Sequence, residues 1–236
     1  MPRWATLIRA GNPGPMTLEG TNTWVLHGPG AAVVVDPGPL LEEHLTRVAA
    51  TGPVDLVLLT HRHPDHAEGA RRFAELTGAP LLDRADFPAD GAAVRGVRVL
   101  HTPGHTDDSV SFVVDRDGMA AVLTGDTILG RGSSVVAHPE GDLAAYLSSL
   151  RRLAELGDIA VLPGHGPVLA SARVAAEAYL GHRLQRLDQV RAALASGDRT
   201  AEEVARRVYA GVDPALWPAA ESSVRAQLAY LDDRQD

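Results

Sequence analysis

The chain has 236 residues, of which 45% are hydrophobic, enough to build one large domain or a main domain with a smaller one attached. Its formal net charge of −8 argues against broad nucleic-acid binding, and all 22 of its cationic Lys or Arg residues are arginine. The absence of cysteine excludes disulfides, thiolate metal sites and a cysteine nucleophile. Any metal ion must therefore be held by His, Asp or Glu.

Strands and helices are mixed through the first two thirds of the chain. Apolar runs bounded by glycine and proline predict strands at 23–27, 31–36, 54–60, 80–83, 97–101, 110–115, 120–124 and 159–163. Helical patterns occupy 40–51, 67–77 and 143–156, the last with Asp142 as its N-cap and Gly157 as its stop. This mixture predicts an α/β protein with a core built on sheets.

After residue 170 the pattern becomes purely helical, with predicted helices at 171–195, 200–210 and 222–231. We therefore expect a catalytic domain at 1–170 and a small helical appendage at 171–236. No apolar stretch has the length of a signal peptide or a membrane span, so we expect a soluble, cytoplasmic protein that makes no membrane contact.

The stretch His-Arg-His-Pro-Asp-His at 61–66 directly follows a predicted strand. Three imidazoles and a carboxylate within six residues are not explained by packing. Alternation along an extended loop puts His61 and His63 on one side, and a turn at Pro64 brings Asp65 and His66 beside them. Imidazole nitrogen and carboxylate oxygen are natural zinc ligands, so this loop is a candidate metal site.

Three further candidates follow predicted strands in glycine-bounded turns, namely His105, Asp126 and His165. Glycines next to a ligand let the backbone approach a crowded centre. Together with the first cluster, these residues supply enough ligands for two metals. One metal would take His61, His63 and His105, the other Asp65, His66 and His165, with Asp126 as a bridge.

The ordered set formed by the loop at 61–66, His105, Asp126 and His165 resembles the binuclear metal signature of the metallo-β-lactamase superfamily. The resemblance covers essentially the whole chain. It implies a four-layer αββα sandwich with the metals at one edge of two packed sheets, and a hydroxide bridging the metals as the attacking group. Two zinc ions are the expected cofactors, with iron or manganese as alternatives.

Several motifs indicate which families within this superfamily the chain resembles most. Zinc β-lactamases usually carry cysteine where this chain has Asp126, which disfavours antibiotic hydrolysis. The motifs at 12–15, 20–23, 102–109 and 163–167 resemble the lactamase-β-like protein 2 family, some of whose members cleave single-stranded RNA. Fungal polyketide thioesterases share much of this pattern, and the Asp form is also similar to glyoxalase II. The family carries a C-terminal winged-helix-like domain, which matches the helical appendage, with a wing that is reduced or absent here.

These observations predict a metal-dependent hydrolase in which Asp65 orients the attacking hydroxide and handles its proton. The expected substrate is a thioester or related acyl ester, and single-stranded RNA cleaved by an endoribonuclease is the alternative. A different class, a non-catalytic nucleic-acid-binding module stabilised by metal, would need a closed ligand set. A homo-oligomer is compatible with the sequence.

Candidate substrate contacts lie outside the ligand set. Asn22 and Thr23 could line the mouth of the site, or form a turn that caps a strand. His182, Arg183 and Arg186 share one helix face, which could contact a phosphate or carboxylate, or simply face solvent. Residues 171–236 contain nine arginines against ten acidic residues, which does not support phosphate-backbone binding by the appendage. Beside His105, Asp107 and Asp108 could hydrogen-bond a ligand histidine.

Overall fold

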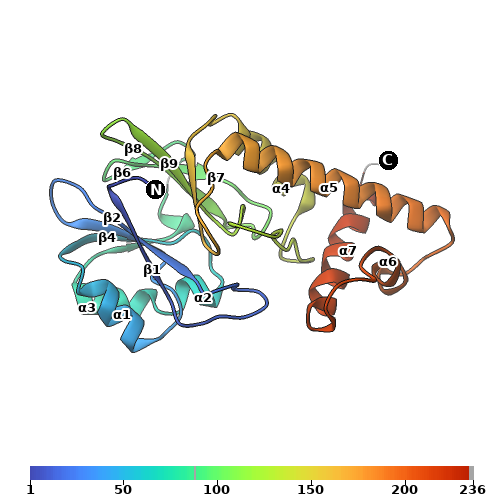
Figure 1. Cartoon of the computed structure of the whole chain (residues 1–236), viewed down its shortest axis with the longest axis horizontal. Coiled ribbons are helices and arrows are strands. Elements are labelled where there is room, and N and C mark those ends of the chain that lie inside the picture. Colours follow the sequence, from blue (N-terminus) through green and yellow to red (C-terminus); the bar gives the residue numbers. More distant parts are fainter. Residues whose placement is uncertain (88, 234–236) are drawn as a thin grey trace.

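Two five-stranded sheets packed face to face form the centre of the computed structural model, which describes residues 1–87 and 89–233 (Figure 1). The first sheet has the order β1-β2-β3-β4-β5, with bounds Ala5–Arg9, Asn22–Leu26, Ala32–Val35, Val54–Leu58 and Leu81–Leu82. The second has the order β10-β9-β8-β7-β6, with bounds Ala160–Pro163, Met119–Gly125, Val110–Arg116, Val97–His101 and Ala93–Val94.

Both sheets are mixed. In the first, β1, β2 and β3 pair antiparallel and β3, β4 and β5 pair parallel. In the second, β10 runs parallel to β9, and the remaining pairs are antiparallel. As a result β7, β9 and β10 all run in the same direction, and their carboxyl ends lie at one edge of the sheet.

Apolar residues on both faces of each sheet explain the layering. In β3, Val33 and Val35 belong to the cluster between the sheets, together with Phe112 of β8, whereas Val34 faces the opposite side. Side chains alternate along a strand, so a continuous apolar run buries both faces. Each sheet therefore needs a helical layer on its outer face.

Helices supply these outer layers. They are α1 (Glu42–Ala49), α2 (Pro64–Ala67), α3 (Ala70–Thr77), α4 (Leu143–Ala154), α5 (Ala172–Ala195), α6 (Ala201–Val208) and α7 (Trp217–Asp232), with 3₁₀ turns at Arg84–Asp86 and Pro214–Leu216. The helices α1 and α3 cover the first sheet, and α4 and α5 cover the second. The long α5 extends beyond the sheets, with α6 and α7 packed along its far half (Figure 1).

The expected four-layer αββα sandwich with a helical C-terminal appendage is confirmed, and each predicted element is present with small shifts at its ends. The sequence analysis did not predict the edge strand β1, the two-residue strand β6 or the short helix α2. It placed the start of the last helix at residue 222, whereas α7 begins at Trp217. No strand follows β10 in the part of the chain that the structure describes, in keeping with a reduced wing.

One hydrophobic cluster extends from the second sheet through α4 and α5 to Val204, Val224 and Leu231 of α6 and α7. Residues from both sides of the predicted boundary near 170 share this cluster, so that boundary stays a prediction. Among the described helices, none combines the length and apolar character needed to cross a bilayer.

Close packing between α4 and the turn before His105 predicts a large effect of a single methyl group. Gly104 has φ +133°, and a Cβ there would lie 2.3 Å from the backbone nitrogen of Tyr146. We expect Gly104→Ala to lower the free energy of unfolding by at least about 2 kcal/mol. The matched change Gly181→Ala, in open space on α5, should raise it by about 0.5–1 kcal/mol. Urea unfolding followed by circular dichroism tests both, and equal effects would contradict this packing argument.

Candidate metal centre

The predicted ligands meet at one edge of the sandwich because each follows the carboxyl end of a strand. The loop at 61–66 follows β4, His105 follows β7, Asp126 follows β9 and His165 follows β10. Pro64 opens the short helix α2, where its missing N–H costs no hydrogen bond, and this helix turns Asp65 and His66 back toward the edge. Strand direction in the two sheets thus brings together residues that are up to about a hundred positions apart.

Three histidines form the first group of donor atoms. The Nε2 atoms of His61 and His105 each lie 3.0 Å from Nδ1 of His63. Ligand atoms bound tetrahedrally to one zinc ion at about 2.1 Å are separated by roughly 3.4 Å. This group can hold a metal ion.

The second group combines a carboxylate with two histidines. Asp65 Oδ2 lies 3.0 Å from Nε2 of His165 and 3.4 Å from Nε2 of His66. The two imidazole nitrogens are 3.2 Å apart. Carboxylate oxygen and imidazole nitrogen at these separations can hold a second ion.

Asp126 lies between the two groups. Its Oδ2 is 3.8 Å from Nε2 of His105 in the first group and 3.5 Å from Nε2 of His165 in the second. Its Oδ1 is buried, accepts no hydrogen bond from the described residues, and lies 3.4 Å from Nε2 of His66 in the second group. A buried carboxylate oxygen without a donor is costly unless a cation is present, so Asp126 is suited to bridge two cations.

Hydrogen bonds on the outer side of the rings fix the tautomers of His61 and His66. Asp36 Oδ2 accepts from Nδ1 of His66 at 2.9 Å and from the hydroxyl of Thr60 at 2.7 Å. Since the Thr60 hydrogen goes to Asp36, its oxygen accepts from Nδ1 of His61 at 3.0 Å. In neutral rings this leaves the lone pair on each Nε2, facing the centre.

In the other three histidines, too, the ring nitrogen that points away from the centre faces a hydrogen-bond acceptor. His63 Nε2 donates to Glu140 at 3.3 Å, and His105 Nδ1 donates to the carbonyl oxygen of Val135 at 2.7 Å. His165 Nδ1 faces the carbonyl oxygen of Gly20 at 3.3 Å. All five rings therefore direct an N–H outward and a lone pair inward, which is the arrangement that metal ligation requires. The donor set fits metal ions.

The two halves of the site differ in electrostatics. Burial, with the neighbouring His66, holds the pKa of His61 well below its ordinary value, and burial also lowers the pKa of His105. Burial would lower the pKa of His165 as well, but Asp126 and Asp65 outweigh it and raise the pKa to about 9. The carboxylate end therefore attracts positive charge, whether a proton or a metal ion, more strongly than the three-histidine end.

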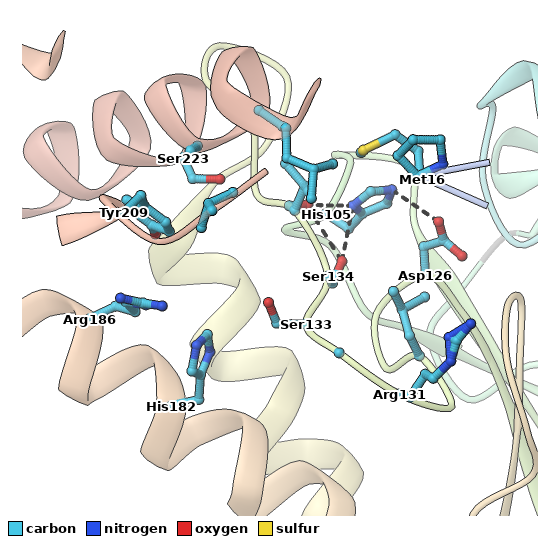
Figure 2. Close-up of a pocket in the computed structure, with 18 of the residues that line it drawn as sticks. Met16, His105, Asp126, Arg131, Ser133, Ser134, His182, Arg186, Tyr209 and Ser223 are labelled. Carbon is cyan, nitrogen blue, oxygen red and sulfur yellow. Dashed lines mark hydrogen bonds and ion pairs between the residues drawn. The ribbon is translucent and has the colours of Figure 1, made fainter. Parts of the chain in front are cut away.

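A cavity of about 310 Å³ extends from His105 and Asp126 to the C-terminal helices (Figure 2). Its walls come from the N-terminal loop, the segment 129–135, α5, the α6–α7 connection and α7. Most of the lining is apolar, and includes Pro15, Met16, Leu18, Leu129, Val135, Tyr209, Val212, Leu216, Ala219 and Ala220. Ligand sites of this size and character commonly bind small organic molecules.

The structure corrects the expectation for Asn22 and Thr23, which are fully buried and do not line the cavity. Asn22 Nδ2 donates to the carbonyl oxygens of Pro163 and Gly166, on either side of His165. Thr23 Oγ1 donates to the backbone oxygen of Asp36 at 2.7 Å. Both side chains are occupied in holding loops that carry or orient ligands.

His182, Arg183 and Arg186 do line the cavity, on the α5 side. Asp107 and Asp108 behave differently from the prediction, because both pair with Arg62 rather than with a ligand histidine. Arg62 also contacts Glu140 at 2.8 Å. These acidic residues therefore belong to an exposed network behind His63.

Sequence analysis missed Asp36 and Glu140, which accept N–H groups from ligand histidines. Asp36 ends a strand before Pro37-Gly38 and has φ +52°, an unusual conformation for a residue other than glycine. A lone aspartate at a strand end was the available signal. Glu140 has no comparable signal, because it reaches His63 from a distant loop.

Two family models match the chain, one over most of the sandwich and the other over the C-terminal helices. A model described as the metallo-β-lactamase superfamily matches residues 16–83 and 79–165. A second model, described as the β-lactamase-associated winged helix domain, matches residues 200–235.

Curated relatives match most of the chain. It is 34% identical to lactamase-like protein vrtG of Penicillium aethiopicum, over 88% of this chain and 74% of the relative. It is 30% identical to a β-lactamase-like protein 2 homolog of Drosophila melanogaster, over 94% and 85%. It is 33% identical to an atrochrysone carboxyl ACP thioesterase of Aspergillus chevalieri, over 87% and 73%.

Solved structures match over nearly the full length. A metallo-β-lactamase family protein from Thermus thermophilus has a TM-score of 0.76 and 26% identity, covering 98% of this chain and 94% of that one. A β-lactamase domain protein from Burkholderia ambifaria has a TM-score of 0.80 and 24% identity, covering 98% and 86%. The second likeness concerns the fold alone.

The outward hydrogen bonds predict that Asp36 controls metal affinity without touching the metal. Asp36→Asn replaces one acceptor oxygen with an NH₂ group that faces either the Thr60 N–H or the donors at Oδ2. We expect metal affinity to fall about 10–100-fold. Metal content measured after dialysis against graded chelator tests this, with Asp115→Asn, an exposed residue of β8, as the control. Unchanged retention in Asp36→Asn would contradict the role of this carboxylate.

Proposed function

The chain belongs to the metallo-β-lactamase superfamily, and from this membership and its site we propose that it is a binuclear metal-dependent hydrolase of acyl thioesters. The observation that carries the choice of substrate is the mainly apolar cavity leading to His105 and Asp126. An acyl chain fits such a lining, and a relative named as a thioesterase among the fungal proteins supports this direction. Zinc is the expected metal, with iron or manganese as alternatives.

When bound, two metal ions would lower the pKa of a water between them toward about 7 and stabilise charge that develops on the carbonyl oxygen. The trihistidine group would hold one ion, and Asp65, His66 and His165 the other, with Asp126 between them. The net reaction adds water to the thioester: a C–O bond forms, the C–S bond breaks, and the products are a carboxylic acid and a thiol.

Asp65 is the residue that we assign to orienting the attacking water and accepting its proton at a carboxylate oxygen. Burial would raise the pKa of Asp65, but when His66 and His165 are protonated, the hydrogen bond from His165 and the charge of His66 keep this pKa lower than usual. The group is therefore an ionised carboxylate at neutral pH, the form in which its oxygens can bind a cation or accept a proton. Positioned proton transfer of this kind contributes about 10²–10⁴-fold to rate.

Cleavage of single-stranded RNA is the alternative hydrolytic function. A cavity of about 310 Å³ has room for a small organic molecule rather than a polynucleotide, and the C-terminal helices lack the net positive charge that binding along a phosphate backbone would need. A non-catalytic metal-stabilised module fits less well, because the cavity reaches the ligands His105 and Asp126. Both alternatives are distinguished from thioester hydrolysis by one set of assays.

We expect metal-loaded protein to release thiol from octanoyl thioesters and to leave a labelled single-stranded RNA intact. Asp65→Asn should reduce kcat by about 10²–10⁴-fold after correction for metal content measured in the same sample. Asp115→Asn serves as the carboxylate control. RNA cleavage that disappears in Asp65→Asn, without thiol release, would establish the alternative. Protein that holds two metals and cleaves neither substrate would contradict both hydrolytic functions.

The position of Ala219 in the cavity wall predicts an effect on chain-length preference. Ala219→Phe fills space where an acyl chain would lie, so kcat/KM for octanoyl thioester should fall about tenfold or more. Acetyl thioester, which has only one methyl group beyond the carbonyl, should be hydrolysed within about twofold of the rate of the unmodified protein. Ala215→Phe, on a nearby exposed residue outside the cavity, is the control. Equal losses for both chain lengths would exclude this wall as an acyl-binding surface.

A further inference from the structure

Two arginines that line the cavity differ in their partners from the surface arginines of the C-terminal helices. Most of the surface arginines pair with a carboxylate, as in Arg173–Asp158, Arg191–Asp188, Arg206–Glu202, Arg207–Asp198 and Arg225–Glu221. Arg183 and Arg186 form no ion pair with any residue that the structure describes. Positive charge on the cavity side of α5 is therefore not neutralised by the protein.

Arg183 is the more deeply buried of the two, with 3% of its surface exposed. It donates to the backbone oxygen of Ser134 and its guanidinium carbon lies 5.1 Å from the ring centroid of Tyr146. Its Nε is buried and has no hydrogen-bond partner among the described residues. A buried charge is costly unless an opposite charge approaches it, so this position favours an anion.

Arg186 lies one turn further along the same face, beside the cavity (Figure 2). Its guanidinium carbon is 4.6 Å from the ring centroid of Tyr209, and among the described residues its NH1 donates to the neutral oxygens of Gln189 and Val208 alone. The neighbouring His182 has a buried Nδ1 without a partner in the described structure. Donors for an anion are thus available at the side of the cavity formed by α5 and the α6–α7 connection.

Charge around the cavity is strongly asymmetric. Among its lining residues the sole carboxylate is Asp126, at the metal end. Arg131 also lines the cavity, but it is paired with Glu19, in contrast to Arg183 and Arg186. An occupant with an apolar body and an anionic group directed toward α5 would match both the lining and the charge.

We propose that Arg186, together with Arg183 and His182, forms an anion subsite that selects thioesters carrying a carboxylate or phosphate at a distance from the reacting carbonyl. This rests on the proposed thioester hydrolysis and specifies its substrate class. The anionic group has two sources: a carboxylate on the acyl chain, or the phosphate of a phosphopantetheine thiol. Arginine suits both, since its planar fork binds these oxyanions bidentately.

Binding of unreactive probes tests the subsite without requiring hydrolysis. Isothermal titration of the metal-loaded protein would compare octanedioate with octanoate, and 4′-phosphopantetheine with pantetheine. Each pair differs by one anionic group, so carboxylate binding to the metals cancels in the first comparison. We expect at least one pair to differ about tenfold or more in affinity, and the pair that does so identifies the source of the anion.

Substitutions on α5 test whether Arg186 causes the difference in affinity within the probe pair. Arg186→Met should reduce that difference to about twofold or less, and Arg186→Lys should restore part of it. Arg191→Met, on the exposed side of α5 and paired with Asp188, should keep the full difference. Equal affinities within both pairs in the unmodified protein, or a difference that survives Arg186→Met, would overturn the subsite.

Kinetics separate failure of the subsite from failure of the proposed function. Hydrolysis of octanoyl and 7-carboxyheptanoyl thioesters at equal rates, without discrimination in the binding assay, would overturn the subsite and leave thioester hydrolysis standing. Discrimination in binding without any thiol release would support the subsite and contradict thioester hydrolysis. Selectivity carried by KM, lost in Arg186→Met, would support both.

Discussion

Seven ionisable side chains share a small, largely buried space, and this constraint governs the rest of the structure. Five imidazole lone pairs and two carboxylates cannot face one another without a compensating positive charge. Each imidazole N–H points away from the centre and toward an acceptor, so the lone pair of each neutral ring points inward, where a cation would bind. The acceptors are Asp36, Glu140, Thr60 and two backbone carbonyls. The acceptors are as necessary to the site as the ligands.

The layered fold is what supplies these acceptors and ligands at one place. Apolar residues on both faces of each sheet demand a sandwich covered by helices, which leaves the strand ends as the edge where polar loops can gather. Further hydrogen bonds then tie loop to loop. Asn22 secures the loop of His165 through Pro163 and Gly166, and Thr23 secures the backbone of Asp36. Two residues expected at the mouth of the site thus act beneath it.

The ligands could be predicted from the sequence because four of them fall within six residues and the rest follow glycine turns at strand ends. Their supporting partners could not. Asp36 is 24 residues from Thr60, and backbone oxygens such as that of Val135 carry no side-chain signal at all. Among the strands, β1 was missed for a related reason: its residues are only partly buried, and pairing with β2 rather than its own apolar pattern defines it. Long-range contacts decide both cases.

The C-terminal helices show why net charge alone says little about binding. Nine arginines and ten acidic residues nearly cancel over 171–236, but the cancellation takes place on the solvent side. Toward the cavity, Arg183 and Arg186 face aromatic rings and neutral oxygens. Arg183 also donates to the backbone oxygen of Ser134, and the next residue, Val135, accepts from the ring of His105. The cavity wall that would bind an anionic substrate is therefore linked by hydrogen bonds to a candidate metal ligand. The same hydrophobic cluster that fixes α6 and α7 against α5 therefore completes the cavity, and the appendage becomes part of the site rather than an addition to it.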